Sequence, residues 1–122
     1  MKKLYQKLAI ELVDAQNNRQ TVAPLIHRFP DLTIDDAYQI SLETLHLKTQ
    51  AGETIVGKKI GVTSEAVQKM LNVHQPDFGF LTDVMHYEDG SAISLKKAQL
   101  IQPRAEGEIA FCLKHDIKGP GV

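Results

Sequence analysis

Two glutamates stand two positions apart inside an otherwise apolar run near the end of the chain. The run is PRAEGEIAFCL, residues 103 to 113, and the glutamates are Glu106 and Glu108. On a β-strand, residues i and i+2 point to the same face with Cα atoms about 6.5–7 Å apart. Like charges so placed repel, and burying them is costly unless a positive group lies between them. The run predicts a strand over residues 99–114, with an opposite, core-facing apolar face made of Ile109, Phe111 and Leu113.

A pair of carboxylates on one strand face is a candidate metal site. Mg²⁺ suits such a pair, because it takes oxygen ligands and keeps waters that substrate oxygens can displace. A solvated strand face explains the same spacing, since glutamate pairs are common on exposed strands. The spacing of Glu106 and Glu108 therefore leaves both interpretations open.

The composition is that of a soluble globular protein of one domain at most. The chain has 122 residues, and its net charge of −1 excludes the broad positive field that nucleic-acid binding needs. A single cysteine, Cys112, cannot form an internal disulfide, which favours a reducing compartment and a cytoplasmic location. No uninterrupted apolar stretch has the length of a membrane helix, so membrane insertion is not expected.

Hydrophobic periodicity predicts helices first and strands later, which indicates an α+β fold rather than alternating βαβ units. Thr33 is the expected cap of the second helix, because Asp35 and Asp36 follow it in the first turn. The predicted elements are a helix over 4–17, a helix from Thr33 to near Gly52, a strand over 54–62, a short helix over 63–71, a turn-rich loop over 74–81, a turn at Asp89-Gly90 and the strand over 99–114.

Three long segments resemble the 2-hydroxypenta-2,4-dienoate hydratases (2-oxopent-4-enoate hydratases) of the fumarylacetoacetate hydrolase superfamily, enzymes of aromatic meta-cleavage catabolism. They are TVAPL at 21–25, AGETIVGKKIGVTSEAVQKMLNVHQPDFGFLTD at 51–83 and LIQPRAEGEIAFCLKHDIKGPGV at 100–122. The resemblance implies a helical segment over 1–53 followed, over 54–122, by the first part of a β-rich catalytic domain. That domain is expected to be the start of a mixed β-sheet or β-roll.

The resemblance also implies that Glu106 and Glu108 bind Mg²⁺ or Mn²⁺. Members of the family are about twice as long and supply a third glutamate ligand further along. This sequence has no glutamate after Glu108. We therefore expect the chain to represent the N-terminal half of a hydratase, and to be inactive and a weak metal binder by itself.

Three further residues are candidates for the chemistry. By resemblance, Lys59 of VGKKIGVT is the active-site lysine, and strand alternation puts Lys58 on the other face. Asp77 of QPDFG favours hydration, because related decarboxylases lack an acid there; a turn-forming role is the alternative. Thr63 is a candidate substrate contact or simply a helix cap.

The implied reaction adds water to a short 2-hydroxydienoate, in equilibrium with its 2-oxo form, to give 4-hydroxy-2-oxopentanoate. The alternatives are a 2-oxo-acid decarboxylase of the 4-oxalocrotonate type, an acylpyruvate hydrolase, or a non-catalytic remnant or assembly chain. The resemblance further implies a homo-oligomer at full length and a complex with a sister decarboxylase.

Overall fold

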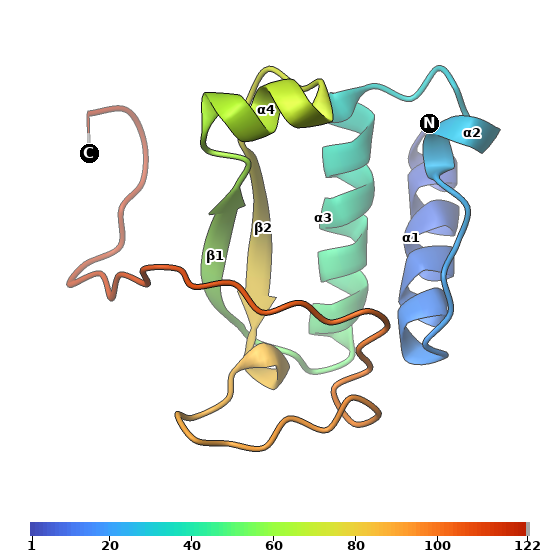
Figure 1. Ribbon diagram of the computed structural model, residues 1–122. Coiled ribbons are helices and arrows are strands. Elements are labelled where there is room, and N and C mark those ends of the chain that lie inside the picture. Colours follow the sequence, from blue (N-terminus) through green and yellow to red (C-terminus); the bar gives the residue numbers. More distant parts are fainter. Residues whose placement is uncertain (122) are drawn as a thin grey trace.

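Helices α1, α2 and α3 occupy the first part of the chain, and the two strands follow with α4 between them (Figure 1). The computed structural model describes residues 1–121. Its elements are α1 (Lys2–Asn17), α2 (Leu25–Arg28), α3 (Ile34–Gln50), β1 (Ile55–Gly61), α4 (Glu65–Leu71), β2 (Asp77–Thr82) and a short 3₁₀ helix, η1 (Asp83–Met85). This order confirms the expected α+β class, with a sheet that is two-stranded and antiparallel in the described residues.

A reciprocal cap fixes the start of α3. The backbone amide of Asp36 donates to the Thr33 hydroxyl oxygen at 3.2 Å, and the backbone amide of Thr33 donates to the Asp36 carboxylate at 2.8 Å. This satisfies two donors at the helix start that would otherwise lack a partner. The Tyr5 hydroxyl of α1 donates to the same carboxylate. Hydrogen bonds from Thr33 and Tyr5 lower the pKa of Asp36 to about 2. Because Tyr5 belongs to α1, its hydrogen bond to Asp36 also links α1 to α3.

Replacing Thr33 with alanine should lower the free energy of unfolding by about 1 kcal/mol, because the cap loses its side-chain oxygen. Urea unfolding of the chain, followed by circular dichroism, measures the change. Thr49→Ala is the matched control, since the Thr49 hydroxyl bonds only to the His46 carbonyl in the last turn of α3. Equal losses in the two variants would show that the cap contributes nothing specific.

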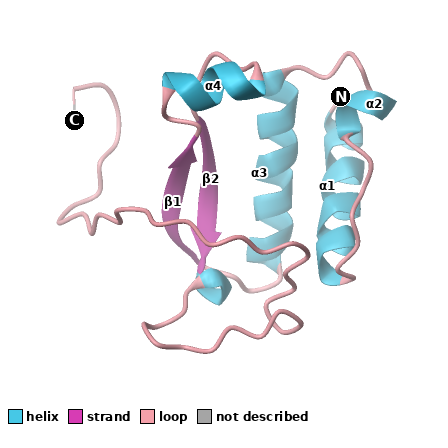
Figure 2. Cartoon of the chain, viewed as in Figure 1, coloured by secondary structure: helices cyan, strands magenta, loops and turns pink. Residues whose placement is uncertain are grey.

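The buried core lies between the helices. Leu8 and Ala9 of α1 and Ile40 of α3 are the buried apolar residues, and burying such side chains is the main source of stability. Partly buried side chains pack around them: Leu4, Tyr5, Leu12, Leu25, Phe29, Leu32 and Leu47. The sheet stands beside α3 on the side away from α1, with α4 across one end of the strands (Figure 2). The helical layer is therefore the scaffold against which the strands are positioned.

The expectation of a loop over 74–81 is wrong for most of its length. Residues Asp77–Thr82 form β2, which pairs antiparallel with β1. Pro76 and Gly79 suggested a loop, but Pro76 precedes the ladder and needs to donate no hydrogen bond in it. Phe78 and Phe80 then alternate with small or apolar residues, which is a strand pattern.

The expected strand over 99–114 is also wrong. Residues 95–99 form turns, and residues 103–113 have no regular secondary structure. A strand needs a neighbour whose backbone groups complete the ladder, and within residues 1–121 no such neighbour pairs with this segment. Its apolar side chains do not reach a core: Ile109 and Phe111 are each 83% exposed. Residues do alternate in PRAEGEIAFCL as they would in a strand, but the described chain contains no strand that pairs with this segment.

The predicted turn at Asp89-Gly90 is confirmed, with Gly90 in the left-handed region at φ 76°. None of the helices in the described residues combines the length and the apolarity that crossing a bilayer requires.

Candidate functional site

The register of the β-ladder decides which side chains share a face. Lys59 lies directly opposite Gly79, and Gly61 lies directly opposite Asp77. Directly opposite residues project to the same face, and so do residues two apart on one strand. Lys59 and Asp77 are therefore diagonal neighbours on one face, which we call the lysine face.

The other face of the sheet is turned toward α3. Phe78 stacks on Tyr38 of α3, with ring centroids 4.5 Å apart and planes at 12°. Lys58 is on this side as well, with its ammonium 5.6 Å from the centroid of the Phe80 ring. The two neighbouring lysines therefore have different surroundings: Lys58 lies over an aromatic ring, while Lys59 is on the face that α3 leaves free.

The segment with the paired glutamates reaches Lys59. The Lys59 ammonium is 3.6 Å from a carboxylate oxygen of Glu108, with side chains 44% and 54% exposed. A half-exposed pair of this kind is screened by water and stabilises the fold only slightly. The pair holds the Lys59 ammonium beside the Glu108 carboxylate. Glu106, two residues earlier in the chain, is exposed. The expectation that Lys59, rather than Lys58, faces the glutamates agrees with this contact.

An upstream contact helps to hold the same segment. The Arg19 side chain donates to the Leu100 carbonyl at 3.1 Å, which joins the end of α1 to the chain that leads into residues 103–113. Together with this contact, the pair between Lys59 and Glu108 brings Glu108 to the sheet, although the segment that carries it is not a strand.

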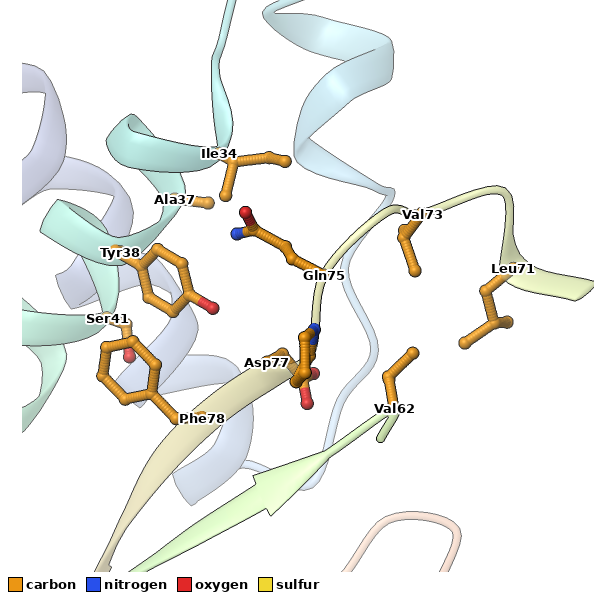
Figure 3. A pocket seen from close by; sticks show the side chains of 11 residues that line it. Ile34, Ala37, Tyr38, Ser41, Val62, Leu71, Val73, Gln75, Asp77 and Phe78 are labelled. Carbon is orange, nitrogen blue, oxygen red and sulfur yellow. The ribbon is translucent and has the colours of Figure 1, made fainter. Parts of the chain in front are cut away.

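Asp77 borders a cavity of about 380 Å³ between α3, the end of β1 and the start of β2 (Figure 3). Tyr38 and Phe78 form one wall, and Val62 lies at the opposite end (Figure 3). Asp77 is the one carboxylate among the lining residues; the others are Ile34, Ala37, Tyr38, Ser41, Val62, Leu71, Val73, Gln75, Pro76 and Phe78. A single acid at the edge of a largely apolar cavity is suited to proton transfer with a small organic ligand.

The chain turns sharply between β1 and α4. Val62 has φ 55°, a left-handed conformation that β-branched residues rarely adopt, and its carbonyl accepts a hydrogen bond from the Gln68 side chain at 2.9 Å. Ser64 then caps α4 by accepting from the Val67 amide at 3.3 Å. The cap is therefore Ser64, and Thr63 is an exposed residue between the turn and the cap. The role of Thr63 as a substrate contact stays a prediction.

The acidic side chains are of the type that binds a hard metal ion, but there are too few of them to complete a site. Glu106 and Glu108 offer carboxylate oxygens, the ligands that hard divalent cations prefer. No group of three or more histidine, cysteine, aspartate or glutamate side chains in residues 1–121 is placed to hold a metal ion. Two carboxylates leave most of an octahedral shell to other ligands, so these two residues alone would not complete a metal site.

One residue of the candidate site was not singled out in the sequence. Tyr38 of α3 stacks on Phe78 and lines the cavity beside Asp77. Its helical spacing gave no sign of this contact, because the partner lies on a strand that the sequence did not indicate.

Comparison with known proteins identifies close relatives. The chain is 64% identical over 111 residues to the 2-hydroxyhexa-2,4-dienoate hydratase of Comamonas testosteroni, covering 91% of this chain and 42% of that enzyme. It is 57% identical over 121 residues to the 2-hydroxypent-2,4-dienoate hydratase of Pseudomonas putida, covering 99% of this chain and 54% of that enzyme. No family model matches the sequence.

A solved structure shares the fold. The 4-oxalocrotonate decarboxylase from Pseudomonas putida G7, complexed with magnesium and adipate, aligns with a TM-score of 0.66 at 32% identity, covering 68% of this chain and 32% of that one. The chain thus spans about half the length of the hydratases that it matches, which agrees with the expected partial coverage. From these matches and the shared fold, the chain is a relative of the 2-hydroxydienoate hydratases.

Proposed function

We propose that the chain contributes part of the active site of a metal-dependent hydratase that acts on 2-hydroxypenta-2,4-dienoate and produces 4-hydroxy-2-oxopentanoate. The observation that carries this proposal is the placement of Lys59 beside Glu108, on the same sheet face as Asp77. A lysine and an aspartate on one sheet face, with the carboxylate of Glu108 beside the lysine, supply proton-transfer groups and an oxygen ligand together. The identity to named hydratases supports the same conclusion.

Glu106 and Glu108 would hold the divalent cation, Mg²⁺ or Mn²⁺, with further ligands from elsewhere. When bound, such a cation supplies positive charge for the substrate's carboxylate and 2-oxygen. The magnesium in the related decarboxylase structure supports a cation of this class. We propose that Glu108, through its contact with Lys59, also sets the distance between the cation and the proton-transfer groups.

Lys59 and Asp77 would move the protons. Hydration begins with transfer of the 2-hydroxyl proton to the terminal carbon, C5, which gives the 2-oxo form with a double bond between C3 and C4. Water then adds its oxygen to C4, and the proton that the water loses is balanced by a proton delivered to C3. In this proposal Lys59 exchanges a proton near the metal ligands, and Asp77 orients and deprotonates the water. The contact of Lys59 with Glu108 and the cavity beside Asp77 support these roles. Thr63, exposed at the end of β1, would bind the substrate by hydrogen bonding.

A second function, decarboxylation of a 4-oxalocrotonate-type 2-oxo acid, is favoured by one observation, the fold shared with the magnesium-bound decarboxylase. Asp77 argues for hydration, since loss of carbon dioxide needs no group to activate water. We further propose that the whole protein is a cytoplasmic homo-oligomer of the fumarylacetoacetate hydrolase type that associates with such a decarboxylase.

Activity can be tested in a chimera in which this chain replaces the matching part of the Comamonas testosteroni hydratase; the 64% identity makes the replacement feasible. With Mg²⁺ present, the chimera should consume 2-hydroxypenta-2,4-dienoate, measured as loss of the dienoate absorbance and appearance of 4-hydroxy-2-oxopentanoate. It should release no carbon dioxide from a 4-oxalocrotonate-type acid. Carbon dioxide release without hydration would replace the hydratase proposal with the decarboxylase one.

A further inference from the structure

Gly61, the last residue of β1, leaves room for the carboxylate of Asp77. The two residues are directly opposite each other in the ladder. A β-carbon built on Gly61 would stand 2.5 Å from Oδ1 of Asp77 and 3.6 Å from its carboxyl carbon. The first distance is well inside the about 3.5 Å of a favourable non-bonded contact. The Asp77 side chain therefore occupies the space that any larger residue at position 61 would need.

The backbone conformation does not require a glycine at this position. Among the glycines of the described chain, a positive φ occurs at Gly52, Gly90, Gly119 and Gly121 and not at Gly61. Gly57, on the same strand, offers a comparison, because a β-carbon there would meet Leu81 at an ordinary 3.7 Å. Of these two strand glycines, only Gly61 has its side-chain space filled by an ionisable group.

We propose that Gly61 is a positioning residue for Asp77, a role that rests on the proposed function of that aspartate. With no side chain at position 61, the carboxylate lies across the ladder on the lysine face, toward the strand that carries Lys59. Diagonal neighbours of this kind have Cα atoms about 7–8 Å apart, which leaves room between their side chains for one small ligand or water. A methyl group at position 61 turns the carboxylate away from that space.

Steady-state kinetics of the chimera give the first test. Gly61→Ala should lower kcat at least about tenfold, toward the value of Asp77→Asn, with little change in KM, because misplacement by about 1 Å costs catalysis heavily. The double variant Gly61→Ala/Asp77→Asn should be no slower than the slower single variant, since both changes act through one carboxylate. The control Gly57→Ala should keep kcat. A Gly61→Ala variant with unchanged kcat, or effects that simply add, would overturn the proposal.

A structural measurement separates this inference from the proposed function. In crystal structures of the full 122-residue chain, the Asp77 carboxylate should lie over residue 61 in the unaltered protein and be rotated off it in Gly61→Ala, with β1 and β2 still paired. A carboxylate in the same place in both would refute the positioning role even if the chimera is active. If the unaltered chimera is inactive, or Asp77→Asn has no effect, the proposed function fails, and the crystal structures still decide whether Gly61 positions Asp77.

Discussion

Replacing Lys59 with alanine in the chimera should lower kcat by about 10²–10⁴-fold, the range that a positioned proton-transfer group contributes. Lys59 is the ammonium held 3.6 Å from Glu108, on the face shared with Asp77. The affinity for Mg²⁺ should be unchanged or raised, because the variant removes a positive charge beside the carboxylates without removing an oxygen ligand. Stopped-flow absorbance gives kcat, and calorimetric titration gives the metal affinity.

Lys58→Ala is the matched control, one residue away on the same strand. Lys58 lies over the Phe80 ring on the opposite face, so its loss should cost at most about 1 kcal/mol of stability and little activity. If Lys58→Ala proves the more damaging change, the strand register that puts Lys59 with the glutamates does not apply in the active enzyme.

The second large effect is expected from the paired glutamates. Glu106→Gln and Glu108→Gln should each weaken binding of Mg²⁺ to the chimera, because each removes a charged ligand. The loss should exceed about 10–100-fold, which is the cost of losing a residue that only supports a metal ligand. Activity should fall with metal occupancy and recover in part at high Mg²⁺ in the single variants. It should not recover in the double variant, which retains neither carboxylate.

Glu65→Gln controls for the loss of a negative charge. Glu65 is 89% exposed at its side chain and pairs with Lys69 within α4, away from the paired glutamates in sequence. Glu65→Gln should leave both the Mg²⁺ affinity and the activity of the chimera unchanged. Single variants at positions 106 and 108 with the metal affinity of the unaltered chimera would show that neither glutamate is a ligand.

Local signals in the sequence predicted the helices well. Thr33 followed by two aspartates fixed the start of α3, and the observed cap uses those residues as expected. Such signals depend on atoms within one turn of each other, so no knowledge of the rest of the fold is needed. The separation of Lys58 and Lys59 onto opposite faces was predicted as well, because alternation along β1 requires only that the strand exists. The choice of Lys59 as the lysine beside the glutamates came from the family resemblance and not from the alternation.

Pairing between distant segments was not predictable in the same way. Strand β2 was taken for a loop because Pro76 and Gly79 are common in turns, whereas its ladder depends on β1, which ends 16 residues earlier, at Gly61. The run that contains Phe111 was taken for a strand because it alternates, but alternation does not supply a partner strand. The contact of Gly61 with Asp77 follows from the same pairing, so it could be found only in the structure.

We propose that this chain supplies Lys59, Asp77 and two glutamate ligands to a hydratase site that needs further ligands from outside these residues. The decisive quantity is the initial rate of dienoate absorbance loss, with and without Mg²⁺, for the 122-residue chain and for the chimera under identical conditions. We expect metal-dependent hydration by the chimera and none by the chain alone, since two carboxylates hold Mg²⁺ poorly against water. Turnover by the chain alone at a rate comparable to the chimera, or an inert chimera, would contradict it.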